Sequence, residues 1–280
     1  MKTHTYSKIF ILITLFINFN VYSQLPRFEY NVGHTTLDSA NIEITYKLEW
    51  VNDLKNSEKK NIDILKLYTG GRISKSFSYL ISRNDSICAI LEAKHSEKLP
   101  SEPSEATTEE VFKYFKSNEL VVMNRVDNTI YKYNEELPKF KWIIQPEKVI
   151  IQKYHCQKAI TKFRGREYEA WFTSEIPLSD GPWKFYGLPG LILRVYDSDK
   201  QYIFNCAGIK KTKTSIPVKT CKREHVLTTR EKLAELLAKK YKNVTSYYNI
   251  MGVTYGTKIN GKYVFDPPNY SLPYNPIELE

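Results

Sequence analysis

The stretch from residue 154 to 196 constrains the fold more than any other part of the chain. It is dense in aromatic residues, β-branched residues and Gly-Pro turns, which favours a meander of short strands. At its centre, Gly-Leu-Pro-Gly-Leu-Ile (residues 187–192) predicts a type II turn, because Pro189 suits the first corner and Gly190 supplies the positive φ of the second. The apolar residues that follow predict a buried strand.

The same stretch resembles a known protein family. The resemblance is carried by the pattern GxxYxAWFxxxIPxxxGPxxxxGLPGLI, preceded by CQKA, and is to the GLPGLI family of envelope proteins from Gram-negative bacteria. The closing Asn-Pro-Ile-Glu (residues 275–278) is also similar to the usual ending of that family. The matching residues are Cys156, Gln157, Lys158, Ala159, Gly165, Arg166, Tyr168, Ala170, Trp171, Phe172, Ile176, Pro177, Gly181, Pro182 and residues 187–192. The resemblance implies an envelope protein, and it carries over no catalytic or binding residues.

The N-terminus has the features of a secretory signal peptide, which we assign to residues 1–23. Lys2 and Lys8 give a positive start, and the apolar run at residues 9–19 is too short to span a bilayer. The alternative is an N-terminal membrane anchor, while a lipoprotein anchor is not expected because no cysteine follows the run. We therefore expect an exported protein that is periplasmic, associated with the outer membrane, or secreted.

The remaining residues, 24–280, predict a single, mainly β domain with a minor helical part. Residues 41–50 alternate apolar and polar side chains without a slip, and further apolar runs recur at short intervals with no βαβ alternation. We expect a strongly curved antiparallel sheet or a partly open barrel. Residues 228–241 predict one C-terminal amphipathic helix packed on it, with Thr228 and Glu231 as a capping box. Residues 108–116 predict a short helix, residues 73–82 a strand, and residues 84–85 a turn.

Positive charge is concentrated in one segment. The chain has 41 Lys or Arg and 31 Asp or Glu, for a net charge of +10, and residues 207–242 alone carry eleven basic and three acidic residues. We expect a contact surface for an outer-membrane protein or an anionic membrane, although a solvated loop and helix face would have the same composition. Nucleic acid is not an expected partner of an exported protein. The candidate surface residues are Lys210, Lys211, Lys213, Lys222 and Arg223.

Four cysteines in an exported chain permit two disulfides, in three connectivities. Cys206 and Cys221 flank the lysine-rich segment and could close it as a loop, which would leave Cys88 with Cys156. The alternative is unpaired, buried thiols. The spacing excludes a CxxC metal or redox motif.

Reactive chemistry is not evident, and we expect neither a metal nor a cofactor. The familiar nucleophile, metalloprotease, phosphate-loop and dinucleotide motifs are absent, and His155 and Cys156, as strand neighbours, point to opposite faces. An enzyme is less expected than a binding protein, and a hydrolase acting on envelope or extracellular polymers, peptide or glycan, is the alternative. The candidate site for an apolar ligand comprises Trp171, Trp183, Phe185, Tyr186 and Arg166. The aromatic residues could equally form core, and Arg166 could be part of an exposed, charged strand face.

Overall fold

The computed structural model describes residues 29–280, except residues 97, 253–255, 260, 266–267 and 269. The predicted signal peptide and its cleavage site lie outside the described residues. The helices are α1 (Tyr79–Ala93), α2 (Arg230–Lys242) and α3 (Val244–Ile250), with a 3-10 turn at Leu54–Asn56. The strands are β1 (His34–Val51), β2 (Lys60–Thr69), β3 (Ile73–Ser78), β4 (Glu109–Tyr114), β5 (Glu119–Val126), β6 (Thr129–Glu136), β7 (Ile143–Ile151), β8 (Tyr154–Phe163), β9 (Arg166–Thr173), β10 (Leu191–Asp197), β11 (Tyr202–Cys221), β12 (Val226–Leu227), β13 (Gly256–Ile259) and β14 (Lys262–Phe265).

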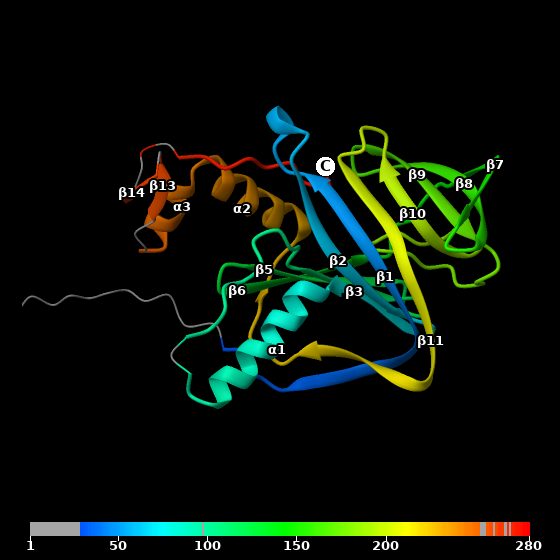
Figure 1. Cartoon of the computed structure of the whole chain (residues 1–280), viewed down its shortest axis with the longest axis horizontal. Helices are drawn as coiled ribbons and strands as arrows, with labels where there is room; N and C mark the ends of the chain where they lie inside the picture. Colours follow the sequence, from blue (N-terminus) through cyan, green and yellow to red (C-terminus); the bar gives the residue numbers. More distant parts are fainter. Residues whose placement is uncertain (1–28, 97, 253–255, 260, 266–267, 269) are drawn as a thin grey trace, which may run out of the picture.

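One large sheet dominates the molecule (Figure 1). Its strand order is β12-β6-β5-β4-β3-β2-β1-β11-β10-β9-β8-β7, and the short β13–β14 hairpin forms a sheet of its own. The mainly β prediction is confirmed. The predicted curved antiparallel sheet or partly open barrel is corrected in two details, because β12 pairs parallel to β6 and the sheet is not closed into a barrel but stays open between its edges at β12 and β7.

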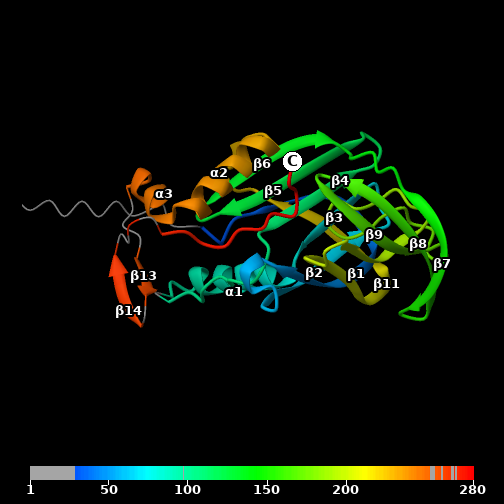
Figure 2. The same ribbon diagram turned by 90° about the horizontal axis from the view of Figure 1, so that it is seen from above.

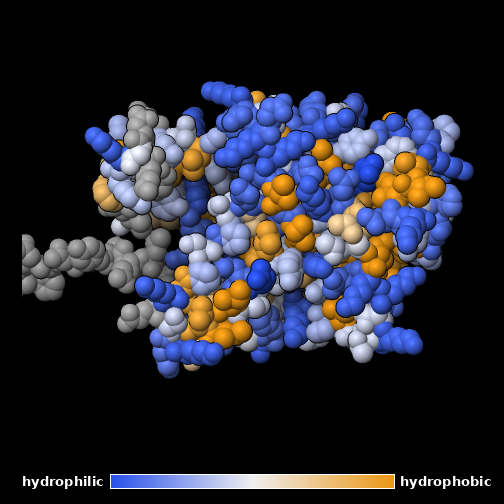
Figure 3. All heavy atoms as spheres, in the orientation of Figure 1, coloured by the Kyte–Doolittle hydropathy of each residue, from blue (hydrophilic) through white to orange (hydrophobic). Residues whose placement is uncertain are grey.

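The sheet is strongly bent (Figures 1 and 2). The larger of two clusters of buried side chains, the main core, draws residues from strands near both edges, including Tyr133 on β6 and Ala159 on β8. Bulges help to produce the bend, because the β1–β11 pairing shifts register at three places. The surface in the view of Figure 3 is mainly hydrophilic, with apolar groups over α1 and over the β7–β8 end.

The alternation predicted at residues 41–50 is confirmed within β1. Ile42, Ile44, Tyr46 and Leu48 are buried, and the residues between them are partly exposed. The Tyr46 hydroxyl donates to the Ile192 carbonyl oxygen at 2.6 Å, which ties β1 to the start of β10. The first strand therefore fixes the inner face against which the central stretch packs.

Two predictions between residues 73 and 116 are wrong. The expected strand ends at Ser78, whose side chain accepts from the Ile81 N–H as an N-cap, and α1 then runs through the expected turn at residues 84–85. The expected helix at 108–116 is the strand β4, in which Val111 and Phe112 are both buried on opposite faces. Burial on two faces produces a continuous apolar run that also fits a helix.

The predicted C-terminal helix is confirmed as α2, displaced by about one residue. Thr229, and not Thr228, is the N-cap and accepts from the Lys232 N–H. Leu233 is buried in the main core, and Leu236 and Leu237 pack against it. The following α3 is held to the β5–β6 turn by Asp127, whose carboxylate accepts from Lys240 of α2 at 2.7 Å and from the hydroxyls of Tyr247 and Tyr248 at 3.0 and 2.6 Å. Among the described helices, none has the length and apolar character that crossing a bilayer requires.

The turn at residues 187–192 differs from the predicted type II turn. The Gly190 N–H donates to the Leu188 carbonyl oxygen at 2.8 Å, which closes a tighter turn about Pro189, and Gly190 has φ +154°. The Leu191 N–H then donates to the Ile176 carbonyl oxygen. Pro189 and Gly190 therefore form a turn at the predicted position, but it is tighter than the predicted type II turn.

The predicted disulfides are not formed, and all four cysteines carry free thiols. Cys206 and Cys221 lie 15 residues apart on the same strand, β11, so the segment between them is not a loop and their separation far exceeds the span of a disulfide. Cys88 is on α1, which packs on β2 and β3, whereas Cys156 is on β8 near the far edge of the sheet. Burial raises the pKa of Cys156 and of Cys206 to about 11, which makes both weak nucleophiles.

Candidate functional site

The inner face of the sheet encloses a hollow of about 700 Å³, which we call the main hollow. Its walls are the sheet, the loop at residues 102–108, helix α2 and the segment at residues 274–277. The lining combines aromatic rings with amide and carboxyl groups. Its aromatic and polar residues include Tyr30, Trp50, Phe77, Trp183, Tyr202, Phe204, Tyr241, Tyr248, Tyr274, Asn52, Asn124, Asn128, Asn275, Glu102, Glu109 and Asp127.

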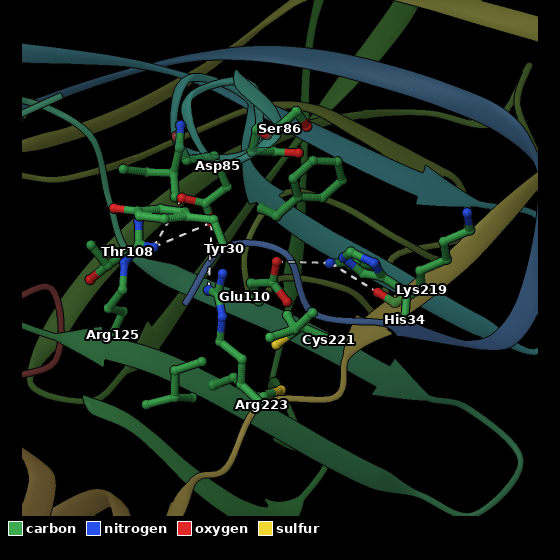
Figure 4. A pocket seen from close by; sticks show the side chains of 18 of the residues that line it. Tyr30, His34, Asp85, Ser86, Thr108, Glu110, Arg125, Lys219, Cys221 and Arg223 are labelled. Atoms are coloured by element: carbon green, nitrogen blue, oxygen red, sulfur yellow. Dashed lines mark hydrogen bonds and ion pairs between the residues drawn. The ribbon is translucent and has the colours of Figure 1, made fainter. Parts of the chain in front are cut away.

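A second hollow of about 560 Å³ adjoins the first beside α1 (Figure 4). It is lined by several charged groups that already pair with one another. Lys75 donates to Glu110 at 2.8 Å and to the Lys219 carbonyl oxygen at 3.0 Å, and the Arg125 guanidinium lies 3.0 Å from Asp85. Because these charged groups already bind one another, fewer of them are available to a ligand in the second hollow.

Glu109 lies in the wall that the two hollows share. Its carboxylate accepts from the Trp183 indole N–H at 3.0 Å and from the Asn124 amide at 3.2 Å. Burial raises the pKa of Glu109, although the nearby Lys184 opposes the shift. The site therefore holds a carboxyl group that is easier to protonate than an exposed glutamate.

Trp183 presents its indole to Glu109 from a strained backbone. The φ of Trp183 is +53°, which is a rare conformation for a bulky residue. Its backbone N–H donates to the Ser76 hydroxyl oxygen at 3.1 Å. Asp180, three residues earlier, fixes this loop through a buried ion pair with Lys113 at 2.5 Å, and Lys113 also donates to the carbonyl oxygens of Gly181 and Phe185. The loop at 180–186 is thus held rigidly against the sheet.

Glu109 provides a prediction for the pH dependence of stability. A carboxyl group whose pKa is raised on folding contributes stability below its unfolded value near 4.5, and this contribution is lost as the pH rises through the folded value. We therefore expect the wild type to lose stability relative to Glu109→Gln as the pH rises above the unfolded value of 4.5. Urea unfolding of both proteins at a series of pH values measures the difference, and a difference that stays constant with pH would contradict a raised pKa at Glu109.

Arg166 is the centre of a socket for the C-terminal segment. Its guanidinium donates to the carbonyl oxygens of Pro276 and Ile277, at 2.8 and 3.0 Å, and to the Asn275 side chain at 2.8 Å. Asp197 balances its charge at 2.8 Å. The prediction that Arg166 lies on an exposed strand face is wrong, because Arg166 is buried and binds this chain's own tail.

Lys184 holds the next residue of the same segment. Its side chain is fully buried, and its ammonium donates to Glu278 at 2.7 Å, to Glu135 at 3.3 Å and to the Tyr133 hydroxyl at 3.0 Å. These contacts hold residues 274–277 as one wall of the main hollow. The two similarities noted in the sequence, the central block and the closing Asn-Pro-Ile-Glu, are the two halves of one contact.

The predicted aromatic residues do not all line the main hollow. Trp183 lines the main hollow, whereas Phe185 is buried in the core. Tyr186 packs against Phe140 and lies outside the lining of either hollow. Trp171 is half-buried beside Glu169, to which its indole donates at 2.9 Å, and it also lies outside both linings. Only Trp183 of this group is positioned to contact a ligand in the main hollow.

The predicted basic residues lie in two different environments, one exposed and one half-buried. Lys210, Lys211 and Lys213 are exposed on β11, and Lys222 is exposed just after it. Arg223 is half-buried in the lining of the second hollow, with its guanidinium over the Tyr30 ring (Figure 4). The contact surface that the sequence predicts thus reduces to the exposed lysines.

Several site residues were not predicted from the sequence. Glu109 and Asn124 belong to no motif, and Lys184 is one lysine among many. The similarity of the closing residues to a family ending was the only signal for the tail. Within the described part of the chain, no group of three His, Cys, Asp or Glu side chains could hold a metal ion.

Comparisons with known proteins match a family and a fold. A family model described as a protein of unknown function (Porph_ging) matches residues 162–194, which include Arg166, Lys184 and the turn at 187–192. No curated protein matches the chain. Two solved structures of PNGF-II, in C2 and P21 space groups, are 17% and 16% identical to it, with TM-scores of 0.49 and 0.50. Each match covers 78% of this chain and 35% of the PNGF-II chain, so this chain spans about a third of the length of PNGF-II. Because the sequence identity is this low, the likeness concerns the fold alone.

Proposed function

We propose that this chain is an exported envelope protein of the GLPGLI type that binds a ligand in the main hollow without transforming it. The observation that supports this function is the hollow itself. Its volume of about 700 Å³ falls within the usual range for ligand sites, and its lining mixes flat aromatic surface with hydrogen-bonding groups. The signal-peptide features of residues 1–23 support export.

The lining indicates the chemistry of the ligand. Trp50, Trp183 and Tyr274 contribute aromatic rings to the lining, and Asn52 and Asn124 contribute polar amides. A ligand that suits these walls has apolar faces and polar edges, as a short glycan or peptide of the envelope does.

We further propose the exposed lysines of β11 as the contact surface for a partner. Lys210, Lys211 and Lys213 lie close together along one strand, and an acidic outer-membrane protein would complement their charge. Replacing all three by glutamate should abolish co-purification with the partner protein from detergent-solubilised envelope and leave the unfolding midpoint unchanged. Unchanged co-purification would contradict this assignment.

Tryptophan fluorescence tests the ligand site, because two of the four tryptophans line the main hollow and two do not. In a Trp142→Phe/Trp171→Phe background, only Trp50 and Trp183 remain as reporters. We expect a saturable change in emission when the protein is titrated with soluble peptidoglycan fragments, and no such change when Trp50 and Trp183 are replaced instead. A titration series of glycan, peptide and fatty-acid probes that leaves the emission unchanged would contradict a ligand site in the hollow.

A hydrolase acting on envelope polymers is the second candidate, and one observation favours it. Glu102 and Glu109 both line the main hollow, and burial raises the pKa of each, so two carboxyl groups suited to acid and base roles share one cavity. Product analysis of the same peptidoglycan fragments separates the candidates. Binding without products supports the binding protein, whereas products that form with the wild type and not with Glu109→Gln would establish the hydrolase.

A further inference from the structure

The end of the molecule formed by α3 and the β13–β14 hairpin carries exposed apolar side chains. Ile250 at the end of α3 is 85% exposed, and Tyr263 and Phe265 on β14 are each 69% exposed. Figures 1 and 2 both place α3 and the hairpin at the same end, away from the bend of β11. We call Ile250, Tyr263 and Phe265 the apolar tip.

The hairpin lacks the support that the other strands have. β13 and β14 pair only with each other, whereas the remaining strands form the large sheet. A two-stranded hairpin with exposed aromatic residues is marginally stable in water unless a further surface covers it. Three side chains are too small an area for a stable protein interface, which buries about 800 Å² on each partner.

The charge around the apolar tip identifies what could cover it. Residues 239–266 contain five lysines and one acidic residue, Asp266, which follows Phe265. Lys240 is engaged by Asp127, whereas Lys262 is exposed and Lys239 is 71% exposed in a surface pair with Glu235. Exposed apolar side chains at an end of the molecule that also carries exposed lysines complement an anionic bilayer surface.

We propose that the apolar tip inserts into the interfacial layer of an anionic lipid membrane, with the neighbouring lysines against the headgroups. Aromatic side chains favour the level of the headgroups, and each lysine near an anionic leaflet contributes about 1 kcal/mol. The contact lies outside both hollows. Membrane binding through the apolar tip is therefore independent of ligand binding in the main hollow.

Vesicle co-sedimentation of the mature protein, residues 24–280, tests the proposal. We expect binding to vesicles of phosphatidylethanolamine with phosphatidylglycerol, and much weaker binding to phosphatidylcholine vesicles. The double variant Tyr263→Ser/Phe265→Ser should bind the anionic vesicles at least about tenfold more weakly. The matched control is Leu54→Ser, which removes a side chain of 58% exposure from the 3-10 turn and should leave binding unchanged.

A second pair of variants tests the charge. Lys239→Gln/Lys262→Gln should weaken binding to anionic vesicles, whereas Lys210→Gln/Lys211→Gln should not, because Lys210 and Lys211 lie on β11 away from the tip. The proposal is overturned if the wild type binds neither vesicle, if the Tyr263/Phe265 variant binds as well as the wild type, or if Leu54→Ser loses as much binding. A lipid-free dimer that the Tyr263/Phe265 variant abolishes would also overturn it, because the tip would then bind a second copy of the chain.

Discussion

Replacing Gly190 by alanine is expected to destabilise the protein by roughly 3–5 kcal/mol, enough to unfold much of a marginally stable population. A Cβ at this position would lie 2.1 Å from the Thr173 carbonyl oxygen and 2.6 Å from its carbonyl carbon. Both are backbone atoms of β9, so neither can rotate away as a side chain would. The φ of +154° adds strain for any residue with a Cβ.

Gly208 provides the matched control for this substitution. It lies on β11, and a Cβ placed there has no heavy atom within 4 Å. We expect Gly208→Ala to be neutral or stabilising by up to about 1 kcal/mol, because it lowers the entropy of the unfolded chain. Urea midpoints of the two variants measure the contrast. Equal midpoints would show that the close approach of residue 190 to β9 does not constrain the fold.

Arg166→Met is the second substitution with a large expected effect, a loss of about 3–5 kcal/mol. The Arg166 side chain is 4% exposed and Asp197 is 2% exposed, so the change would leave a buried carboxylate without its counter-ion. It would also remove the donors to Asn275, Pro276 and Ile277. The fold should lose both an ion pair and the anchor of its C-terminal segment.

Arg72→Met is the control for the loss of an arginine. The Arg72 side chain is 76% exposed and lies 3.6 Å from Asp38, so its removal should cost less than about 1 kcal/mol. Thermal and urea unfolding compare the two variants. If Arg166→Met were as mild as Arg72→Met, the buried contact with the tail would not contribute to stability.

The sequence predicts a strand correctly where only one of its faces is buried, because apolar and polar side chains then alternate. β1 buries one face, so its side chains alternate and its prediction holds. β4 buries both faces, so Val111 and Phe112 give no alternation and a helix fits equally well. The α1 helix lacks an apolar stripe, because it buries Asn84 and exposes Ile90, and only its cap at Ser78 marks the start.

The candidate site was less predictable because its contacts join distant parts of the chain. Arg166 meets residues 275–277 across about 110 positions of sequence, and charged neighbours on a strand usually indicate an exposed face. Glu109 meets Trp183 across 74 positions. Trp183 was predicted as a ligand contact for its aromatic ring, and its place in the main hollow is consistent with that role. Asp180 and Lys184 are both buried, and each pairs with a residue distant in sequence, Asp180 with Lys113 and Lys184 with Glu278.

The contact between the central block and the tail can be tested most directly by backbone amide exchange of residues 274–280 in the wild type and in Arg166→Met. If Arg166 and Lys184 hold this segment as a wall of the main hollow, its amides, including Leu279 N–H on the Arg164 carbonyl oxygen, should exchange slowly in the wild type. They should exchange at least about tenfold faster in Arg166→Met, under conditions where the β1 amides of both proteins remain protected. Equal exchange of the tail in the two proteins would contradict the assignment of Arg166 as the residue that anchors it.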